Sequence, residues 1–361
     1  MKQKSWAKTR ITELLNIKYP IVQGPFGGGL SSVALTSTVS TLGGLGSFGG
    51  QHYSASEIVE FDRAIRRLTD KPFNLNLWVN DRDEQLANFD KDRYNKLKQI
   101  FTPYLDGLEI PLEEMPNDLG PKYEDQLQAI LEIKPPVFSF MFGIPSEEVL
   151  EACRRNGTKT IGTATTVEEA IALEKAGVDA IVATGFEAGG HRASFMSLPD
   201  NSLTGTFALI PQIADNTSIP LIAAGGIADA RGIRAAFALG ADAVQIGTAF
   251  LATSQSNAIP EHKEKLFSDD AKYSTLTRML TGRLSRVVKN KLTTELKNSE
   301  HLFAPYPLQR IFMSSLARTF VENQKSEYNI FSSGQSAPLL KHKDATELFL
   351  SLVDAMNKLS S

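Results

Sequence analysis

Two glycine-containing turns are the part of this chain best suited to holding a phosphate group. Gly225-Gly226 follows one predicted strand, and Gln245-Ile246-Gly247-Thr248 ends the next. Glycine has no Cβ, so the backbone N–H groups of such turns can approach an anion closely. Each turn taken alone is equally consistent with an ordinary tight turn. Their occurrence after two successive strands favours a phosphate site.

A histidine-containing loop is the second candidate for chemistry. The segment Gly185-Phe186-Glu187-Ala188-Gly189-Gly190-His191-Arg192 follows another predicted strand. His191, flanked by Gly189 and Gly190, can exchange a proton near neutral pH because the unperturbed imidazole pKa is ~6.5. It suits a general base or a hydrogen-bond donor to a substrate oxyanion; the alternative is a surface histidine in a structural hydrogen bond. Arg192 either pairs with a ligand anion or is a solvated or salt-bridged surface arginine.

Amide and hydroxyl side chains end several other predicted strands. Gln23 and Asn76 end the first and third strands, and Thr163 and Thr184 end the fifth and sixth. Amides carry both donors and acceptors, which match the polar edges of a flavin ring. Any one of these residues alone is as well explained by a loop-stabilising or capping hydrogen bond. The two amides could converge on one ligand, whereas the two hydroxyls could touch a ligand or cap the next segment and have low specificity.

Cysteine and histidine usage argues against a metal site. Cys153 is the only cysteine and is expected to be a packed thiol within a helix, so no thiolate cluster or internal disulfide is available. The remaining histidines show no metal-ligand spacing and are expected to be structural or exposed, namely His52, His262, His301 and His342. His52 follows a Gly49-Gly50 turn and could approach the mouth of the site.

The elements that must position these residues alternate between strand and helix. Short apolar runs and helical patterns follow one another between residues 135 and 253, which predicts βαβ units and a parallel sheet. The expected strands lie at residues 20–23, 44–48, 73–79, 137–143, 160–163, 180–184, 220–224 and 243–247. Eight strands predict an α/β fold of the TIM, or (β/α)8, barrel type. An open doubly wound sheet is less favoured because no G-x-G-x-x-G follows the first strand.

The segments outside these units predict additions to the barrel. Residues 1–254 are expected to form the barrel, with a charged helical insertion at 81–134. Residues 255–345 are expected to form a mostly helical subdomain or lid beside the barrel mouth, and residues 346–361 a C-terminal helix. The lid would control access of solvent and oxygen.

Composition excludes several broad classes. The 361 residues include 38 basic and 41 acidic side chains, and 42% are hydrophobic, as in an ordinary globular protein. This balance gives no support to nucleic-acid binding. No stretch approaches ~18 uninterrupted apolar residues, and the N-terminus has no signal-peptide pattern, so we expect a cytoplasmic protein that does not span a membrane.

Several motifs together resemble the nitronate monooxygenases, formerly called 2-nitropropane dioxygenases. The similar pieces are the loop from Gly185 to Arg192 and the segments Gln23–Gly29, Phe73–Leu77, Ala223–Ile227, Gln245–Leu251, Leu280–Arg283 and Ser333–Gln335. The loop and the last strand turn are also similar to flavin mononucleotide (FMN)-dependent enoyl-acyl-carrier-protein reductases. The pairing of Gln23–Gly29 with Leu280–Arg283 and Ser333–Gln335 favours the monooxygenase branch.

The resemblance implies a flavoenzyme with bound FMN and His191 as its active-site residue. The expected FMN-binding residues are Gln23, Gly24, Asn76, Thr163, Thr184, Gly189, Gly190, Gly225, Gly226, Gln245, Ile246, Gly247, Thr248 and Gln335. Thr184 stands where many members carry glutamine. The implied reaction uses dioxygen to oxidise a nitronate or nitroalkane to a carbonyl compound and nitrogen oxides. Propionate 3-nitronate is the substrate that the resemblance suggests most readily, and its oxidation is a detoxification. The resemblance is compatible with a homodimer.

Three other functions remain as alternatives. An enoyl-thioester reductase on the same barrel would use NAD(P)H. An inosine monophosphate dehydrogenase type of barrel would need a cysteine after the sixth strand, and this chain has none there. A non-catalytic FMN-binding protein would have no need of a base such as His191.

Overall fold

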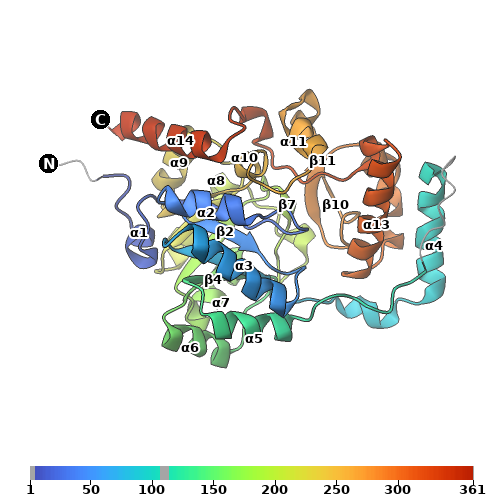
Figure 1. Ribbon diagram of the computed structural model, residues 1–361, viewed down its shortest axis with the longest axis horizontal. Helices are drawn as coiled ribbons and strands as arrows, with labels where there is room; N and C mark the ends of the chain where they lie inside the picture. Colours follow the sequence, from blue (N-terminus) through green and yellow to red (C-terminus); the bar gives the residue numbers. More distant parts are fainter. Residues whose placement is uncertain (1–4, 106–113, 361) are drawn as a thin grey trace.

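An eight-stranded parallel sheet closes into a barrel in the computed structural model, which describes residues 5–105 and 114–360 (Figure 1). Its strands are β1 (Ile21–Gln23), β2 (Gly46–Gly49), β3 (Phe73–Trp78), β4 (Val137–Met141), β5 (Lys159–Ala164), β6 (Ala180–Thr184), β8 (Leu221–Ala224) and β9 (Ala243–Ile246). Sheet neighbours follow the chain order, and β9 pairs with β1. A parallel bridge between Val22 and Leu45 joins β1 to the start of β2 and closes the ring. The predicted strands and barrel are confirmed.

Helices surround the sheet and cover its outer face. They are α2 (Val33–Thr41), α3 (Ala55–Leu68), α5 (Tyr123–Ile133), α6 (Glu147–Asn156), α7 (Val167–Ala176), α8 (Thr206–Asn216), α9 (Ala230–Ala238) and α14 (Ala345–Ser360). The C-terminal helix α14 packs against α2 and α9, so the last helix of the chain fills the place between the first and seventh helices of the ring (Figure 1).

The strands are buried on both faces, which is why they read as continuous apolar runs. Ile181 belongs to the core between sheet and helices, whereas its neighbour Val182 belongs to a second cluster inside the barrel. That inner cluster also contains Ile11 and Leu15 of α1 (Arg10–Leu15), which plugs the amino-terminal end of the barrel. The opposite end, where the strands finish, is left for a site.

A second, separate apolar core lies beside this open end. We use the name cap for residues 84–105 together with residues 260–339. Its elements are η1 (Glu84–Asn88), α4 (Lys91–Phe101), η2 (Thr102–Leu105), α11 (Pro260–Phe267), η4 (Asp269–Lys272), β10 (Ser274–Thr277), β11 (Ser285–Val288), α12 (Lys291–Glu295), η5 (Lys297–Leu302), α13 (Leu308–Glu322), η6 (Ser326–Tyr328) and η7 (Ala337–Leu339). Phe101 of α4 and Phe312 of α13 share the apolar cluster of the cap. Segments far apart in the sequence therefore share this core, whereas α11, η4 and η7 of the cap pack on the barrel core through Leu266, Ala271 and Ala337.

The cap differs in detail from the expected insertion and lid. Residues 81–134 divide into two parts: η1, α4 and η2 join the cap, whereas α5 packs on α3 at the barrel wall. Residues 106–113 of that segment lie outside the described residues. Residues 255–345 contain the strands β10 and β11 as well as helices, and β11 also pairs with β7 (Gly190–His191). No helix in the described part of the chain is long and apolar enough to cross a membrane.

Candidate active site

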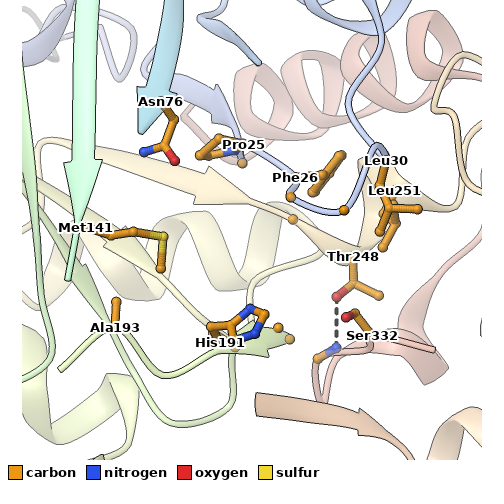
Figure 2. A pocket seen from close by; sticks show the side chains of 18 of the residues that line it. Pro25, Phe26, Leu30, Asn76, Met141, His191, Ala193, Thr248, Leu251 and Ser332 are labelled. Atoms are coloured by element: carbon orange, nitrogen blue, oxygen red, sulfur yellow. Dashed lines mark hydrogen bonds between the residues drawn. The ribbon is translucent and has the colours of Figure 1, made fainter. Parts of the chain in front are cut away.

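A cavity of about 630 Å³ opens at the carboxyl ends of the barrel strands, between the barrel and the cap (Figure 2). Twelve of the residues expected from the sequence line it, namely Gly24, Asn76, Thr163, Thr184, Gly189, Gly190, His191, Gly225, Gly226, Gln245, Gly247 and Thr248. Parallel strands all end at the same edge of a barrel, so residues distant in the sequence meet there. The structure thus brings most of the candidate residues together around one space.

Three of the expected residues do not line this cavity. The buried Gln23 side chain points into the barrel wall, where its Oε1 accepts from the Ser47 N–H at 2.8 Å and its amide donates to the Gly24 carbonyl. Ile246 is fully buried in the apolar core. Gln335 is exposed, and its backbone N–H donates to the Glu187 carbonyl at 2.9 Å.

Glycine turns form one end of the cavity. Gly225 and Gly226 have φ angles of +104° and +72°, which other residues rarely adopt. A Cβ on Gly189 would lie 2.5 Å from the Gly334 nitrogen, so these two turns pack backbone against backbone. The Gly334 N–H donates to Thr248 Oγ1 at 2.9 Å, the dashed line of Figure 2. The turns after β6, β8 and β9 thereby form a compact backbone cradle.

Buried amides and hydroxyls line the barrel side of the cavity. Asn76 and Asn74 both donate from Nδ2 to Ser139 Oγ, at 2.9 and 2.8 Å. The buried Asn74 Oδ1 and both side-chain polar atoms of the buried Gln51 have no hydrogen-bond partner within the described protein. Unsatisfied buried polar atoms are costly, and a bound ligand with donors and acceptors would satisfy them. Asn74 lies two residues from Asn76 on the same face of the strand, so the alternation of the strand could have identified it as a cavity residue. No sequence pattern identified Gln51.

His191 lies at the junction of barrel and cap. It pairs with Ser285 of β11, and its Nε2 is 2.7 Å from Thr281 Oγ1. Its ring lies 4.8 Å from the Trp78 ring in an edge-on arrangement. Burial, and then the nearby Arg283, lower the pKa of His191 to about 3. The imidazole is therefore neutral at pH 7 and can donate one hydrogen bond and accept another.

An aromatic cluster with one arginine forms the wall behind His191. The Arg283 guanidinium lies 4.3 Å from the centre of the Tyr306 ring and 4.5 Å from that of Phe142. It also pairs with Asp83 at 2.8 Å, and Asp83 accepts from the Tyr306 N–H at 3.0 Å. Arg283 therefore ties the cap to the end of β3 and keeps its charge paired. Thr281 and Arg283 belong to the Leu280–Arg283 motif, but the sequence assigned them no role.

Arg192 adopts neither of the two arrangements expected from the sequence. It is buried, and its guanidinium donates to the carbonyls of Thr165, Thr184 and Ser202. Desolvation lowers the pKa of Arg192 to about 10, so it keeps its charge at neutral pH. It fastens the loops after β5 and β6 to each other. It is a positioning residue for the loop that carries His191.

Fold and cavity together define a (β/α)8-barrel enzyme with its site at the carboxyl ends of the strands. The chain belongs to the nitronate monooxygenase family, whose profile matches residues 8–355. The enzyme is accordingly a flavin-dependent oxidoreductase, and nitronates or nitroalkanes and dioxygen are the substrates that this family indicates.

A curated relative and a solved structure carry names that agree with this family, and a second solved structure has a similar fold. A probable nitronate monooxygenase from Staphylococcus aureus (strain JH9) is 35% identical over 98% of this chain and 99% of its own. The crystal structure of a nitroalkane oxidase from Streptomyces ansochromogenes has a TM-score of 0.87 at 33% identity and covers 97% of this chain and 98% of that one. FabK from Thermotoga maritima has a TM-score of 0.74 at 30% identity and covers 98% of this chain and 97% of that one.

Proposed function

We propose that this enzyme uses FMN to oxidise alkyl nitronates, propionate 3-nitronate among them, with dioxygen, which yields carbonyl compounds and nitrogen oxides. Its biological purpose is then the removal of a toxic nitro compound. The observation that carries the proposal is the neutral His191, held by Thr281 at 2.7 Å on the wall of a cavity whose other end is a glycine cradle.

The residues present fit FMN at both ends of the cofactor. The glycine cradle around Gly226, Gly247 and Gly334 offers backbone to a phosphate group. The unpartnered amide atoms of Asn74 and Gln51 suit the polar edges of the ring system. When bound, FMN supplies the redox chemistry: it accepts electrons from the nitronate and passes them to dioxygen.

The protein's part is to bind and orient the nitronate. A neutral His191 can donate a hydrogen bond to a nitronate oxygen without placing a fixed charge in the cavity. When the neutral nitroalkane is the substrate, the same ring would have to accept the α-proton, and its lowered pKa of about 3 disfavours this second role. The hydrogen bond with Thr281 fixes the ring orientation for either role. The aromatic cluster of Trp78, Phe142 and Tyr306 keeps water away from this side.

An anaerobic titration tests this function. Purified holoenzyme is mixed with propionate 3-nitronate while the absorbance of the oxidised flavin is followed. We expect bleaching that reverses when air is admitted, and retained flavin with lost bleaching in a His191→Ala variant. A purified protein without flavin, or flavin that ignores every nitronate, would refute the proposal.

An enoyl-thioester reductase is the second candidate. The loop from Gly185 to Arg192 resembles that family as well, and the likeness to FabK extends over nearly the whole chain. Such an enzyme would take a hydride from NAD(P)H. Bleaching by NADPH alone, with no response to nitronates, would favour the reductase over the monooxygenase.

A further inference from the structure

One cation of the cavity wall has no ion-pair partner among the described residues. Arg310 of α13 is the only arginine or lysine among the described residues that line the cavity, and no aspartate or glutamate is among them. The Arg310 Nε atom is buried and has no hydrogen-bond partner in the described part of the chain. Arg283, by contrast, is already paired with Asp83. Arg310 is half-buried, and a guanidinium in the wall of a cavity that no described acidic side chain lines favours an anionic ligand, because it can form charge-assisted hydrogen bonds with one.

His52 lines the same cavity and carries a buried hydrogen-bond donor. Its Nδ1 accepts from the Gly28 N–H at 2.7 Å. A ring nitrogen that accepts a hydrogen bond carries no proton, so the neutral imidazole holds its proton on Nε2. Burial, and then the positive charge of Arg310, lower the pKa of His52 to about 3, so the ring is neutral. The Nε2 atom is buried and has no partner among the described residues.

The position of these two donors relative to His191 defines where a ligand would extend. The Trp78 ring lies 4.8 Å from the His191 ring and 6.3 Å from the His52 ring. The Trp78 ring is therefore a neighbour of both histidine rings, and all three side chains line the cavity. Ser314, one turn beyond Arg310 on α13, is exposed and lines the cavity, so this end of the cavity faces its mouth.

We propose that Arg310 and the Nε2–H of His52 form a carboxylate subsite that determines specificity among nitronates. The subsite selects substrates that carry a carboxylate at the end of the chain opposite the nitronate group. This inference rests on the proposed function. A guanidinium binds a carboxylate through charge-assisted hydrogen bonds, and the imidazole N–H adds a second direction of contact.

A matched pair of substrates tests the subsite. Propionate 3-nitronate and propane 1-nitronate have the same three-carbon chain and differ in a terminal carboxylate or methyl group. In an Arg310→Met variant we expect KM for propionate 3-nitronate to rise about 10- to 100-fold, the loss of a charge-assisted hydrogen bond. We expect KM for propane 1-nitronate to change less than about threefold. Arg310→Lys should recover part of the loss.

The control is Arg318→Met, which removes the same charge from an exposed position on the same helix. It should leave both substrates unchanged. In the wild type, butyrate should inhibit propane 1-nitronate oxidation more strongly than 1-butanol, and Arg310→Met should remove that difference. This inhibition measurement uses the intact wild-type enzyme, so it still decides the question if a variant fails to fold.

The outcomes separate the subsite from the proposed function. Turnover of propane 1-nitronate by the wild type tests the function, and the ratio of the two KM values tests the subsite. Equal changes for both substrates in Arg310→Met would refute the subsite. Loss of bound flavin in that variant, measured by the flavin-to-protein absorbance ratio, would instead assign Arg310 to the cofactor and also overturn the proposal.

Discussion

The barrel and the cap each have a buried apolar core, but they are assembled from the chain in different ways. Barrel strands that follow one another in sequence are mostly neighbours in the sheet. In the cap, Tyr104 donates to Glu295 at 2.7 Å although 191 residues separate them. The barrel gives the cavity most of its glycine turns and its buried amides, whereas the cap gives it Gly334, Thr281 and Arg310. Residues of both units therefore meet at the glycine cradle, through Gly334 and Thr248, and at His191, through Thr281.

His191 is where the two regions meet, and its loss should have the largest effect. We expect His191→Ala to lower kcat with propionate 3-nitronate by about 10²- to 10⁴-fold, because the donor or base at the reacting group is removed. Flavin content should stay unchanged, since the glycine cradle is intact. Steady-state oxygen consumption measures the rate. His301→Ala, at an exposed cap position, serves as the control; retention of wild-type kcat in His191→Ala would exclude a catalytic role.

A matched pair of core substitutions tests whether barrel and cap are separate units. Phe138 is 0% exposed in the barrel core and Phe312 is 3% exposed in the cap core. Each change to alanine should cost about 3–5 kcal/mol in the region that contains it. Phe138→Ala should release flavin at a lower urea concentration, whereas Phe312→Ala should mainly raise KM. Equal loss of flavin in both variants would show that the two cores unfold as one.

Thr281 offers a smaller test of how the cap positions a barrel residue. Thr281→Val keeps the shape of the side chain but removes the hydroxyl 2.7 Å from His191 Nε2. We expect kcat to fall about 3- to 10-fold, which corresponds to a typical net hydrogen-bond contribution of about 1 kcal/mol. Thr281→Ser should restore most of the rate. A rate equal in all three proteins would show that the imidazole is oriented by packing alone.

The pH dependence of stability should show the buried histidines. Burial lowers the pKa of His262 to about 4, below the value of about 6.5 in the unfolded chain. Between these values the unfolded state binds more protons, so stability is fully present above pH 6.5 and is lost as the pH falls toward 4. The change should reach about 1.4 kcal/mol per pH unit for one such histidine. Urea unfolding from pH 8 to pH 5 measures it.

A substitution assigns this effect to the residue. His262→Gln should lower the slope by the share of one histidine, while His52 and His191, whose pKa values burial also lowers, keep their contributions. Glutamine can still donate to the Ser332 carbonyl, which His262 Nε2 contacts at 2.8 Å, but does not titrate. His301→Gln should leave the slope as it is. An unchanged slope in His262→Gln would mean that other groups account for the loss of stability.

The sequence determined the barrel and most of the residues around the cavity. Local patterns predict each β/α unit, namely an apolar run for the strand, a helical period for the helix and glycine at the turns. These local predictions are sufficient for the barrel because strands that follow one another in the sequence pair in the sheet. All parallel strands end at one edge. Residues such as Asn76, His191 and Gly226 could therefore be placed at one site from their positions after strands.

Tertiary structure alone decided the cap and the finer contacts of the site. The pairing of α4 with α13, the Thr281 contact to His191 and the position of Arg310 depend on residues distant in the chain, and no local period records such contacts. The sequence did not indicate the direction of side chains either: Gln23 points into the barrel wall, and Arg192 is buried and donates to backbone carbonyls. Short-range patterns fix where the backbone goes, whereas long-range packing fixes which side chains face the ligand.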